Sequence, residues 1–486
     1  MSERFEQFST RWGMLVAMLG MAVGTGNIWR FPRVAATNGG GSFLVAWIVF
    51  LLLWSVPLIL IEFSMGKATR AGPVGAFARL MGKRYAWMGA WVAWTAIAIM
   101  FYYAVVAGWT IRYTLAALMG ELGGAEPGAL WEGFSYTWAA VAFQGLALAI
   151  GIFVVARGVR GIETAARLLI PSLFVLVIVL AIRAVTLPGA ERGLAFLFTP
   201  TWEGLSNPQV WLQALTQNAW DTGAGWGLIL TYAVYMRKRE DTALNAFILG
   251  FGNNSVSLLA GIMVLCTVFS LMPDAATQIV GAGNEGLTFI WVPQLFARMP
   301  AGSVFMVLFF AALFFAAMTS LISMLELATR VLQDMGVSRG RAIALIGVLG
   351  FGLGVPSALN ADVFANQDFV WGVGLMVSGL FFAIAVLRHG VTKFRAAFIN
   401  TGDSDIHIGA WWDWAIRLVV VQALVLVGWW IWQVRAEDKW GAFGWANMAL
   451  QFAIAITFFL VINGWLARRA GTVAPHEEEN PILTIP

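Results

Sequence analysis

Cysteine and histidine are almost missing from this chain of 486 residues, which has one cysteine and three histidines. Cys266 stands alone in a long apolar run, so we expect neither a disulfide framework nor a cysteine metal cluster. His389, His407 and His476 fall in polar connecting or terminal segments, which leaves no histidine ligand or acid–base group in the apolar runs. Because covalent catalysis needs a nucleophile and a base, we expect no enzymatic activity.

Charge is also scarce. Only 12% of the residues are charged, 60% are hydrophobic, and the mean hydropathy is +0.77. These values exclude an ordinary soluble domain and indicate a protein of the lipid bilayer. Every backbone polar group in hydrocarbon must be hydrogen-bonded within the protein, and alternating barrel strands are absent from the sequence. We therefore predict an all-α polytopic membrane protein.

Twelve apolar stretches are long enough to cross a bilayer, of which 341–355 is the shortest. They are residues 12–36, 41–66, 86–118, 134–155, 164–186, 209–236, 242–271, 300–332, 341–355, 367–387, 411–433 and 445–467. The expected organisation is an N-terminal segment 1–11, a first repeat 12–190, a second repeat 209–390, two further helices in 411–467 and a tail 468–486. An even number of spans puts both termini on one side.

Lysine and arginine are distributed unequally between the two sides. Of the 30 such residues, 21 lie in segments on the side of the N-terminus and 5 in the opposite loops. Since cytoplasmic loops carry the basic excess, we expect both termini in the cytoplasm and the protein in the cell (inner) membrane. The same excess explains the basic isoelectric point, so the lipid bilayer is the expected partner and a nucleic acid is not.

Two predicted spans are interrupted by glycine at the depth where a membrane helix should be most apolar. The first span reads "GMAVGTGN" at 20–27, and the sixth reads "DTGAGWG" at 221–227. Each glycine weakens a helix interior by up to about 1 kcal/mol relative to alanine, so both spans are expected to unwind. One such helix would be explained by close packing alone. Two of them, five helices apart, indicate two inverted five-helix repeats, with free carbonyls for a cation and free amides for an anion.

These segments resemble the neurotransmitter:sodium symporters. The likeness lies in "AVGTGNIWRFP" at 22–32 and "NGGGSFL" at 38–44, and it continues through "IEFSMG" at 61–66, "GWGLILTYAVYMRK" at 225–238, "AAMTSLISMLE" at 316–326 and "IGAWWDWAIR" at 408–417. It covers nearly the whole chain. It implies sodium-coupled transport by alternating access, in which the first, second, sixth and seventh helices rock against a scaffold.

The resemblance implies two sodium sites built from hard oxygen ligands. The first would use the carbonyl of Ala22 and the side chains of Asn27, Asp221 and Asn253. The second would use the carbonyls of Gly20, Val23 and Ala316 and the hydroxyls of Thr319 and Ser320. Taken alone, those hydroxyls are as readily explained by hydrogen bonds to their own helix.

Asp221 departs from the family pattern, because many relatives carry serine or threonine there. A charged residue in mid-membrane is costly and indicates a function or a cationic partner. Chloride-dependent relatives bind their anion at the positions of Trp47, Gln217, Asp221, Asn253 and Ser257. A fixed carboxylate at this place offsets part of the sodium charge, and we therefore expect chloride-independent transport.

The substrate is expected to be an α-amino acid, because residue 24 is glycine where monoamine-transporting relatives have aspartate. It is expected to be neutral, because the side-chain pocket implied by the resemblance offers no charge to an acidic or basic side chain. Its carboxylate would meet the amides of Thr25 and Gly26 and the hydroxyl of Tyr103, and its amine the carbonyls of Ala22 and Trp220. The apolar side-chain pocket would comprise Met21, Ile99, Tyr103, Trp220, Gly223, Trp226, Ser320 and Met324. The rival is a small organic amine that pairs with Asp221. The particular amino acid, the stoichiometry and the oligomeric state stay open.

The resemblance also implies two gates. Arg30 is the outer-gate arginine, with Asp368 as its expected partner and Asp362 as the fallback. On the cytoplasmic side Asp334 should pair with an N-terminal arginine, for which Arg4 is the candidate. Two further in-span acids, Glu62 and Glu326, are expected to be structural hydrogen-bond hubs. The rival classes are a channel, a proton-coupled permease and a non-transporting sensor.

Overall fold

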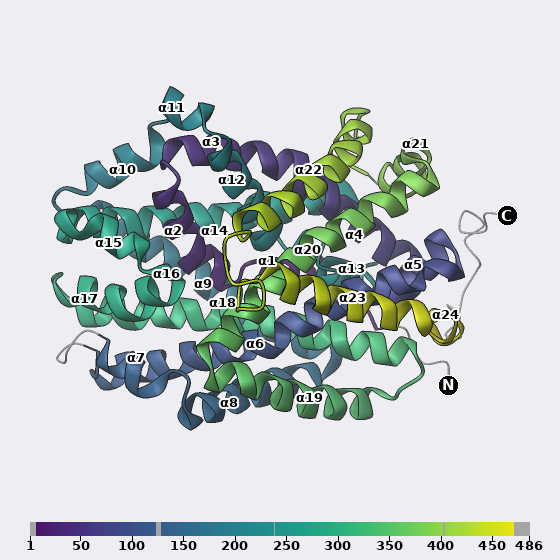
Figure 1. Ribbon diagram of the computed structural model, residues 1–486, viewed down its shortest axis with the longest axis horizontal. Coiled ribbons are helices and arrows are strands. Elements are labelled where there is room, and N and C mark those ends of the chain that lie inside the picture. The colour runs from purple at the N-terminus through teal and green to yellow at the C-terminus, as the bar shows by residue number, and fades with distance from the viewer. Residues whose placement is uncertain (1–5, 123–127, 238, 402–403, 471–486) are drawn as a thin grey trace.

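The computed structural model describes residues 6–122, 128–237, 239–401 and 404–470. Within these ranges the chain is built from helices without a β-strand, which confirms the all-α prediction (Figure 1). The predictions for Arg4 and for most of the tail 468–486 concern residues outside the described ranges.

Nine helices of the described chain are long and apolar enough to cross a membrane. They are Gly41–Thr69 (α3 Gly41–Phe50, a π-helical turn and α4 Val56–Thr69), Lys83–Met119 (mostly α6, Ala86–Met119), α8 Trp138–Val155, α9 Gly158–Val185, α14 Thr242–Leu271, α18 Gly302–Asp334, α19 Arg339–Leu359, α20 Ala361–His389 and α22 Trp411–Gln433. The stretch expected to be shortest, 341–355, is thus part of a 21-residue helix. The helix runs on through Pro356 to Leu359, and Asn360 then caps α20.

The first span is bent. Helix α1 (Arg11–Ala22) ends at Val23, whose backbone is extended with ψ of 106°. The chain resumes as a π-helical turn, Gly26–Arg30, and α2 (Phe31–Thr37), at an angle of 54° to α1. The predicted interruption is therefore present. The last span is bent as well, by 60° between α23 (Trp445–Val461) and α24 (Asn463–Ala470).

The sixth span is broken more completely. Helix α12 (Pro208–Asp221) and α13 (Leu228–Ala233) are separated by six non-helical residues. Gly223, Gly225 and Gly227 have φ of +68°, +86° and +79°, values that side chains with a Cβ rarely adopt. The glycines predicted to weaken this helix thus supply its break. With each bent pair taken as one span, up to eleven spans are found in the described chain, and the twelfth, made of α12 and α13, stays a prediction.

The short helices gather at the two ends of the bundle. Figure 1 places α5 (Pro73–Met81), α21 (Val391–Phe394) and α24 at one end. At the other end lie α7 (Ala129–Phe134), α10 (Ala190–Phe198), α15 (Ala276–Gly281) and α17 (Val292–Ala297). The remaining short helices are α11 (Trp202–Ser206) and α16 (Gly283–Glu285).

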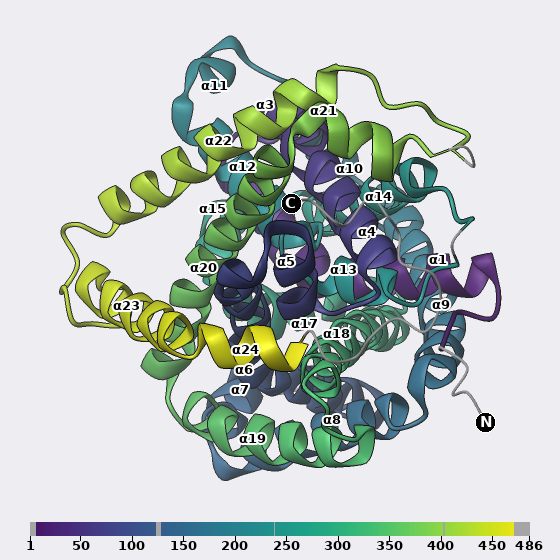
Figure 2. The same cartoon turned by 90° about the vertical axis from the view of Figure 1, so that its right-hand side faces the viewer.

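The broken segments lie at the centre of the bundle. Both views show α13 in the middle, with α8 and α19 along one outer edge (Figures 1 and 2). Large side chains such as Trp54, Trp91 and Trp109 are fully buried around this centre. The interrupted backbone is thereby kept from lipid, where its free polar groups would find no partner.

Candidate functional site

The side chain of Asn27 stabilises the break in the first span. Its Oδ1 accepts a hydrogen bond of 2.7 Å from the backbone N–H of Gly24, a group that the interrupted helix leaves without its usual partner. Its Nδ2 donates to Asn253 Oδ1 at 2.9 Å and to Ser257 Oγ at 2.8 Å on α14. Asn27 therefore joins the break to the seventh span.

A buried carboxylate stabilises the break in the sixth span. Glu62 on α4 accepts hydrogen bonds from the backbone N–H of Gly225 at 2.6 Å and of Leu230 at 3.1 Å. These donors stand just before and within the first turn of α13, where helical N–H groups lack partners and a negative charge is favoured. Glu62 is thus a structural hub, as the sequence predicted.

Asp221 lies between the two breaks, with one carboxylate oxygen bound and the other free. Ser257 donates to its Oδ2 at 2.6 Å. Its Oδ1 is buried and has no hydrogen-bond partner among the described residues. A Cβ added to Gly26 would lie 3.2 Å from that Oδ1, so the free oxygen points at the first break. A buried oxygen of this kind is costly unless a cation or donor completes it.

The residues expected at the first sodium site therefore lie together. Asn27, Asp221 and Asn253 are connected through Ser257 in one buried network. Carboxylate, amide and carbonyl oxygens are hard ligands and fit Na⁺. In the described structure the side-chain oxygen and nitrogen of Gln217 are buried without a hydrogen-bond partner. The indole nitrogen of Trp47 is likewise buried without one.

The residues expected at the second sodium site join α1 to α18. Ser320 Oγ donates to the carbonyl of Val23 at 3.4 Å, and a Cβ on Gly20 would lie 3.2 Å from Thr319 Cβ. Thr319 donates to its own helix, to the carbonyls of Phe315 and Ala316 at 3.0 and 3.1 Å. Thr319 thus makes the hydrogen bond to its own helix that the sequence alone allowed. Ser320 instead contacts the non-helical backbone at the break of the first span.

The expected substrate residues surround the first break. The N–H and hydroxyl of Thr25 each donate to Tyr103 Oη at 3.3 Å. A Cβ on Gly24 would lie 2.8 Å from Ser320 Oγ and 3.2 Å from Tyr103 Oη, so a larger residue would require these hydroxyls to shift. A Cβ on Gly223 would lie 3.2 Å from the sulfur of Met21. Ala22, Ile99, Trp226 and Met324 are also buried here or in the adjoining helices.

Arg30 does not pair directly with the acid predicted for it. Within the described chain no carboxylate lies within 4 Å of Arg30, neither Asp368 nor Asp362. Its guanidinium lies 4.9 Å from the ring centroid of Trp220, a cation–π distance. The contact that Arg30 makes in the described chain is thus with Trp220 and not with the predicted acid.

Asp334 is paired, but with residues that the sequence did not indicate. Arg330 lies 2.8 Å from its Oδ1, and the backbone N–H of Gly72 donates to its Oδ2 at 2.5 Å. Arg4, the predicted partner, lies outside the described residues. The ion pair with Arg330 is local, one helical turn away, and the bond to Gly72 reaches the connection before α5.

Glu163 is a functional candidate that sequence reasoning missed. It accepts hydrogen bonds from the N–H and Oγ of Ser9 at 2.8 and 2.6 Å, and it is paired with Arg167 at 2.6 Å. Thr10 caps α1 and donates to the same carboxylate at 3.3 Å. The available signal was an acidic residue directly before the predicted span 164–186.

Glu326 forms the other predicted hub. It accepts a hydrogen bond of 2.5 Å from the hydroxyl of Tyr235 and is paired with Arg339 at 2.5 Å. The carboxylate is buried and links the end of the sixth span, α18 and α19.

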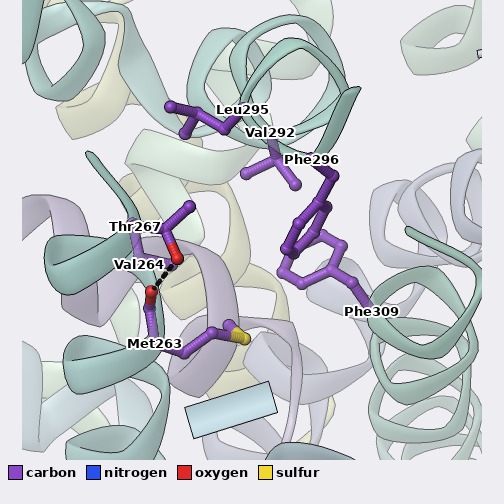
Figure 3. Close-up of a pocket in the computed structure, with 7 residues that line it drawn as sticks. All are labelled: Met263, Val264, Thr267, Val292, Leu295, Phe296 and Phe309. Atoms are coloured by element: carbon purple, nitrogen blue, oxygen red, sulfur yellow. Dashed lines mark hydrogen bonds between the residues drawn. The ribbon is translucent and has the colours of Figure 1, made fainter. Parts of the chain in front are cut away.

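A small cavity lies apart from these residues, between α14, α17 and α18 (Figure 3). Its volume is about 10 Å³, near the least that holds one water molecule. Thr267 is its polar lining residue, and the Thr267 hydroxyl is bonded to the carbonyl of Met263 at 2.6 Å. The cavity is therefore a packing defect rather than a binding site.

Two broken helices that meet in mid-membrane around a free carboxylate oxygen define an ion-coupled secondary transporter. The family model described as "Sodium:neurotransmitter symporter family" matches residues 5–134 and 135–471. The chain belongs to this family. Its architecture is accordingly two inverted five-helix repeats with broken first and sixth helices, followed by two further helices.

Individual relatives are consistent with this assignment. The chain is 30% identical to the sodium-dependent transporter YhdH of Bacillus subtilis over 87% of this chain and 96% of that protein. It is 29% identical to the sodium-dependent serotonin transporter of Drosophila melanogaster over 83% of this chain and 73% of that one. The crystal structure of MhsT in complex with L-phenylalanine superposes with a TM-score of 0.77, at 31% identity, over 87% of this chain and 98% of MhsT.

Proposed function

We propose that this protein is a sodium-coupled symporter of a neutral, hydrophobic amino acid that works by alternating access. The observation that carries the proposal is the free Oδ1 of Asp221, buried and directed at Gly26 between the two breaks. A cation bound there would face the position that a substrate carboxylate would occupy. Sodium and substrate would then raise each other's affinity by the same factor.

Two sodium ions are proposed. The first site comprises the carbonyl of Ala22 and the side chains of Asn27, Asp221 and Asn253. The second comprises the carbonyls of Gly20, Val23 and Ala316 with Thr319 and Ser320. The contact of Ser320 with the Val23 carbonyl supports the second site, because it brings α18 to the end of α1.

The substrate carboxylate would bind the amides of Thr25 and Gly26 and the hydroxyl of Tyr103. The close approach of Tyr103 and Ser320 to Gly24 supports this assignment, since a larger side chain at residue 24 would have to displace their hydroxyls. MhsT, which has a similar fold, was crystallised with L-phenylalanine. Phenylalanine and leucine are therefore the first substrates to test.

Competition of labelled phenylalanine uptake into proteoliposomes tests the substrate class. Leucine should compete, and an alkylamine such as phenethylamine should not. The opposite result would favour the second candidate, a small organic amine that uses Asp221 as its counter-ion. The free carboxylate oxygen is the feature that favours that alternative.

Transport is proposed to be independent of chloride, because Asp221 supplies the fixed negative charge. Its carboxylate stands with Trp47, Gln217, Asn253 and Ser257 at the positions of the chloride site of chloride-dependent relatives. The Asp221→Ser variant should lose uptake in gluconate and regain it in chloride. A variant that remains active and indifferent to chloride would refute this role.

The protein is proposed to lie in the cell membrane with both termini in the cytoplasm. Residues 12–190 and 209–390 are the proposed repeats. Arg30 on the outside, where it contacts Trp220 rather than Asp368, and Asp334 on the inside remain the proposed gate residues. Arg4 is the proposed partner of Asp334. Reporter fusions to the two termini would test the orientation.

A further inference from the structure

Trp220 is the penultimate residue of α12, directly before Asp221 and the break of the sixth span, and belongs to the proposed substrate pocket. Its ring lies 4.9 Å from the guanidinium of Arg30 and 6.1 Å from the ring of Trp226, at an interplanar angle of 73°. The indole of Trp226 is fixed in turn by a hydrogen bond of 3.1 Å to the carbonyl of Ala219. Trp220 is therefore bounded by a cation on one side and by an immobilised ring on another.

The third boundary of Trp220 is the backbone of α20 at Gly372. A Cβ added to Gly372 would lie 2.0 Å from Cζ2 of Trp220 and 2.9 Å from Cε2 and Cη2. These atoms belong to the rigid fused ring and cannot yield by turning a flexible end. The indole of Trp220 thus lies against the backbone of α20, in the space that the Cβ of any other residue at position 372 would occupy.

Conformation does not explain this glycine. Gly372 lies inside α20 and is not among the glycines with positive φ. An alanine would adopt the same backbone and would favour the helix more. The space required by Trp220 is the remaining physical reason for glycine at this position.

We propose that Gly372 is a specificity-determining residue, which sets the size of the substrate side chain by letting Trp220 lie back against α20. The inference rests on the proposed function. With a Cβ at residue 372, the indole would have to move away from α20 toward Trp226, which lines the same proposed pocket. The pocket would then exclude bulky side chains, such as that of phenylalanine, before small ones, such as that of alanine. The structure thus points to bulky neutral amino acids as the substrate class of the wild-type protein.

The experiment measures sodium-dependent binding of phenylalanine and of alanine to purified wild-type protein and to three variants. Gly372→Ala should weaken phenylalanine binding about tenfold or more while changing alanine binding less than about threefold. Trp220→Phe removes the fused ring, and Gly372→Ala combined with Trp220→Phe should bind phenylalanine within about threefold of Trp220→Phe alone. Gly352→Ala on α19, where a Cβ meets no atom within 4 Å, is the control for helix propensity and should match the wild type.

Two results would overturn the proposal. One is Gly372→Ala with unchanged preference between phenylalanine and alanine. The other is a double variant as impaired as Gly372→Ala. If Gly372→Ala fails to fold, the double variant decides, because recovery of folding and binding supports the clash and continued failure refutes it. Wild-type protein that binds no amino acid in sodium would instead refute the proposed function.

Discussion

Ser257 donates a hydrogen bond of 2.6 Å to Oδ2 of Asp221, and the same serine oxygen accepts one of 2.8 Å from Asn27. A hydroxyl has a single proton. Because Ser257 donates this proton to Asp221, it can only accept from Asn27, and the donor and acceptor of each hydrogen bond in the network are thereby fixed. Oδ1 is left free and faces the first break. The arrangement presents a carboxylate oxygen without a hydrogen-bond partner to the first break.

Ser257→Ala removes this orienting bond. A hydrogen bond to a charged group contributes about 1.5 to 3 kcal/mol, so the half-saturating sodium concentration should rise roughly 10- to 100-fold. Sodium titration of substrate binding measures the change. Ser255→Ala is the matched control, because Ser255 lies on the same helix, is exposed, and bonds only to the Phe251 carbonyl in the described structure. Equal sodium dependence in the two variants would contradict the role of Ser257.

Glu62→Gln should loosen the broken sixth span. Glutamine offers one acceptor oxygen where Glu62 uses two, so the N–H of Gly225 or of Leu230 loses its partner. A buried unsatisfied N–H costs about 1 to 3 kcal/mol, and the variant should melt at a lower temperature and bind substrate more weakly. Thermal unfolding followed by size-exclusion chromatography measures this. The exposed Glu191→Gln should leave both quantities unchanged, and a wild-type melting temperature for Glu62→Gln would refute the capping role.

Glu163→Gln should free the N-terminal end of α1 from α9. The carboxylate holds Ser9 through two bonds and is paired with Arg167. Its loss favours the conformation that is open to the cytoplasm, and a cysteine placed at the buried Ala17 should then be alkylated several-fold faster. Thr164→Ala, an exposed neighbour bonded to the Arg160 carbonyl, is the control. Unchanged alkylation would show that Glu163 does not hold the cytoplasmic side closed.

Glu285, in the connection after α14, should make the stability of the folded protein depend on pH. Burial raises the pKa of Glu285 above 4.5, and the negative Asp368 adds to the rise, while its own backbone amide and Arg33 oppose it. The folded state therefore binds the proton more tightly than the unfolded state, and this contribution to stability falls as the pH rises from 4.5 through the raised pKa. Glu285→Gln should remove that part of the slope of melting temperature against pH. A slope as steep as that of the wild type would contradict the role of Glu285. Asp274→Asn, in the same connection, is the control and should leave the slope unchanged.

Local signals in the sequence predicted the helices well, but they did not predict the pairing of side chains across the bundle. The spans 242–271 and 411–433 coincide with α14 and α22 because polar residues bound each apolar run. The glycines within 223–227 indicated the break because glycine, which has no Cβ, adopts a positive φ readily.

The gates were predicted less well, since their partners are distant in the chain. Arg30 contacts Trp220 rather than Asp368, and Glu163 contacts Ser9, 154 residues away. Which residues meet depends on how broken helices pack, and no local pattern records that geometry. Gly372 was missed for the same reason, because its significance is the indole that lies against it.

The central claim is that sodium binding at the breaks drives substrate uptake. The most direct measurement is uptake of labelled phenylalanine into proteoliposomes under an imposed inward sodium gradient, with choline as the replacement cation. The account predicts accumulation that requires sodium, depends on its concentration with a Hill coefficient between about one and two, and collapses when the gradient is dissipated. Equal uptake in choline, or accumulation driven by a proton gradient alone, would contradict it.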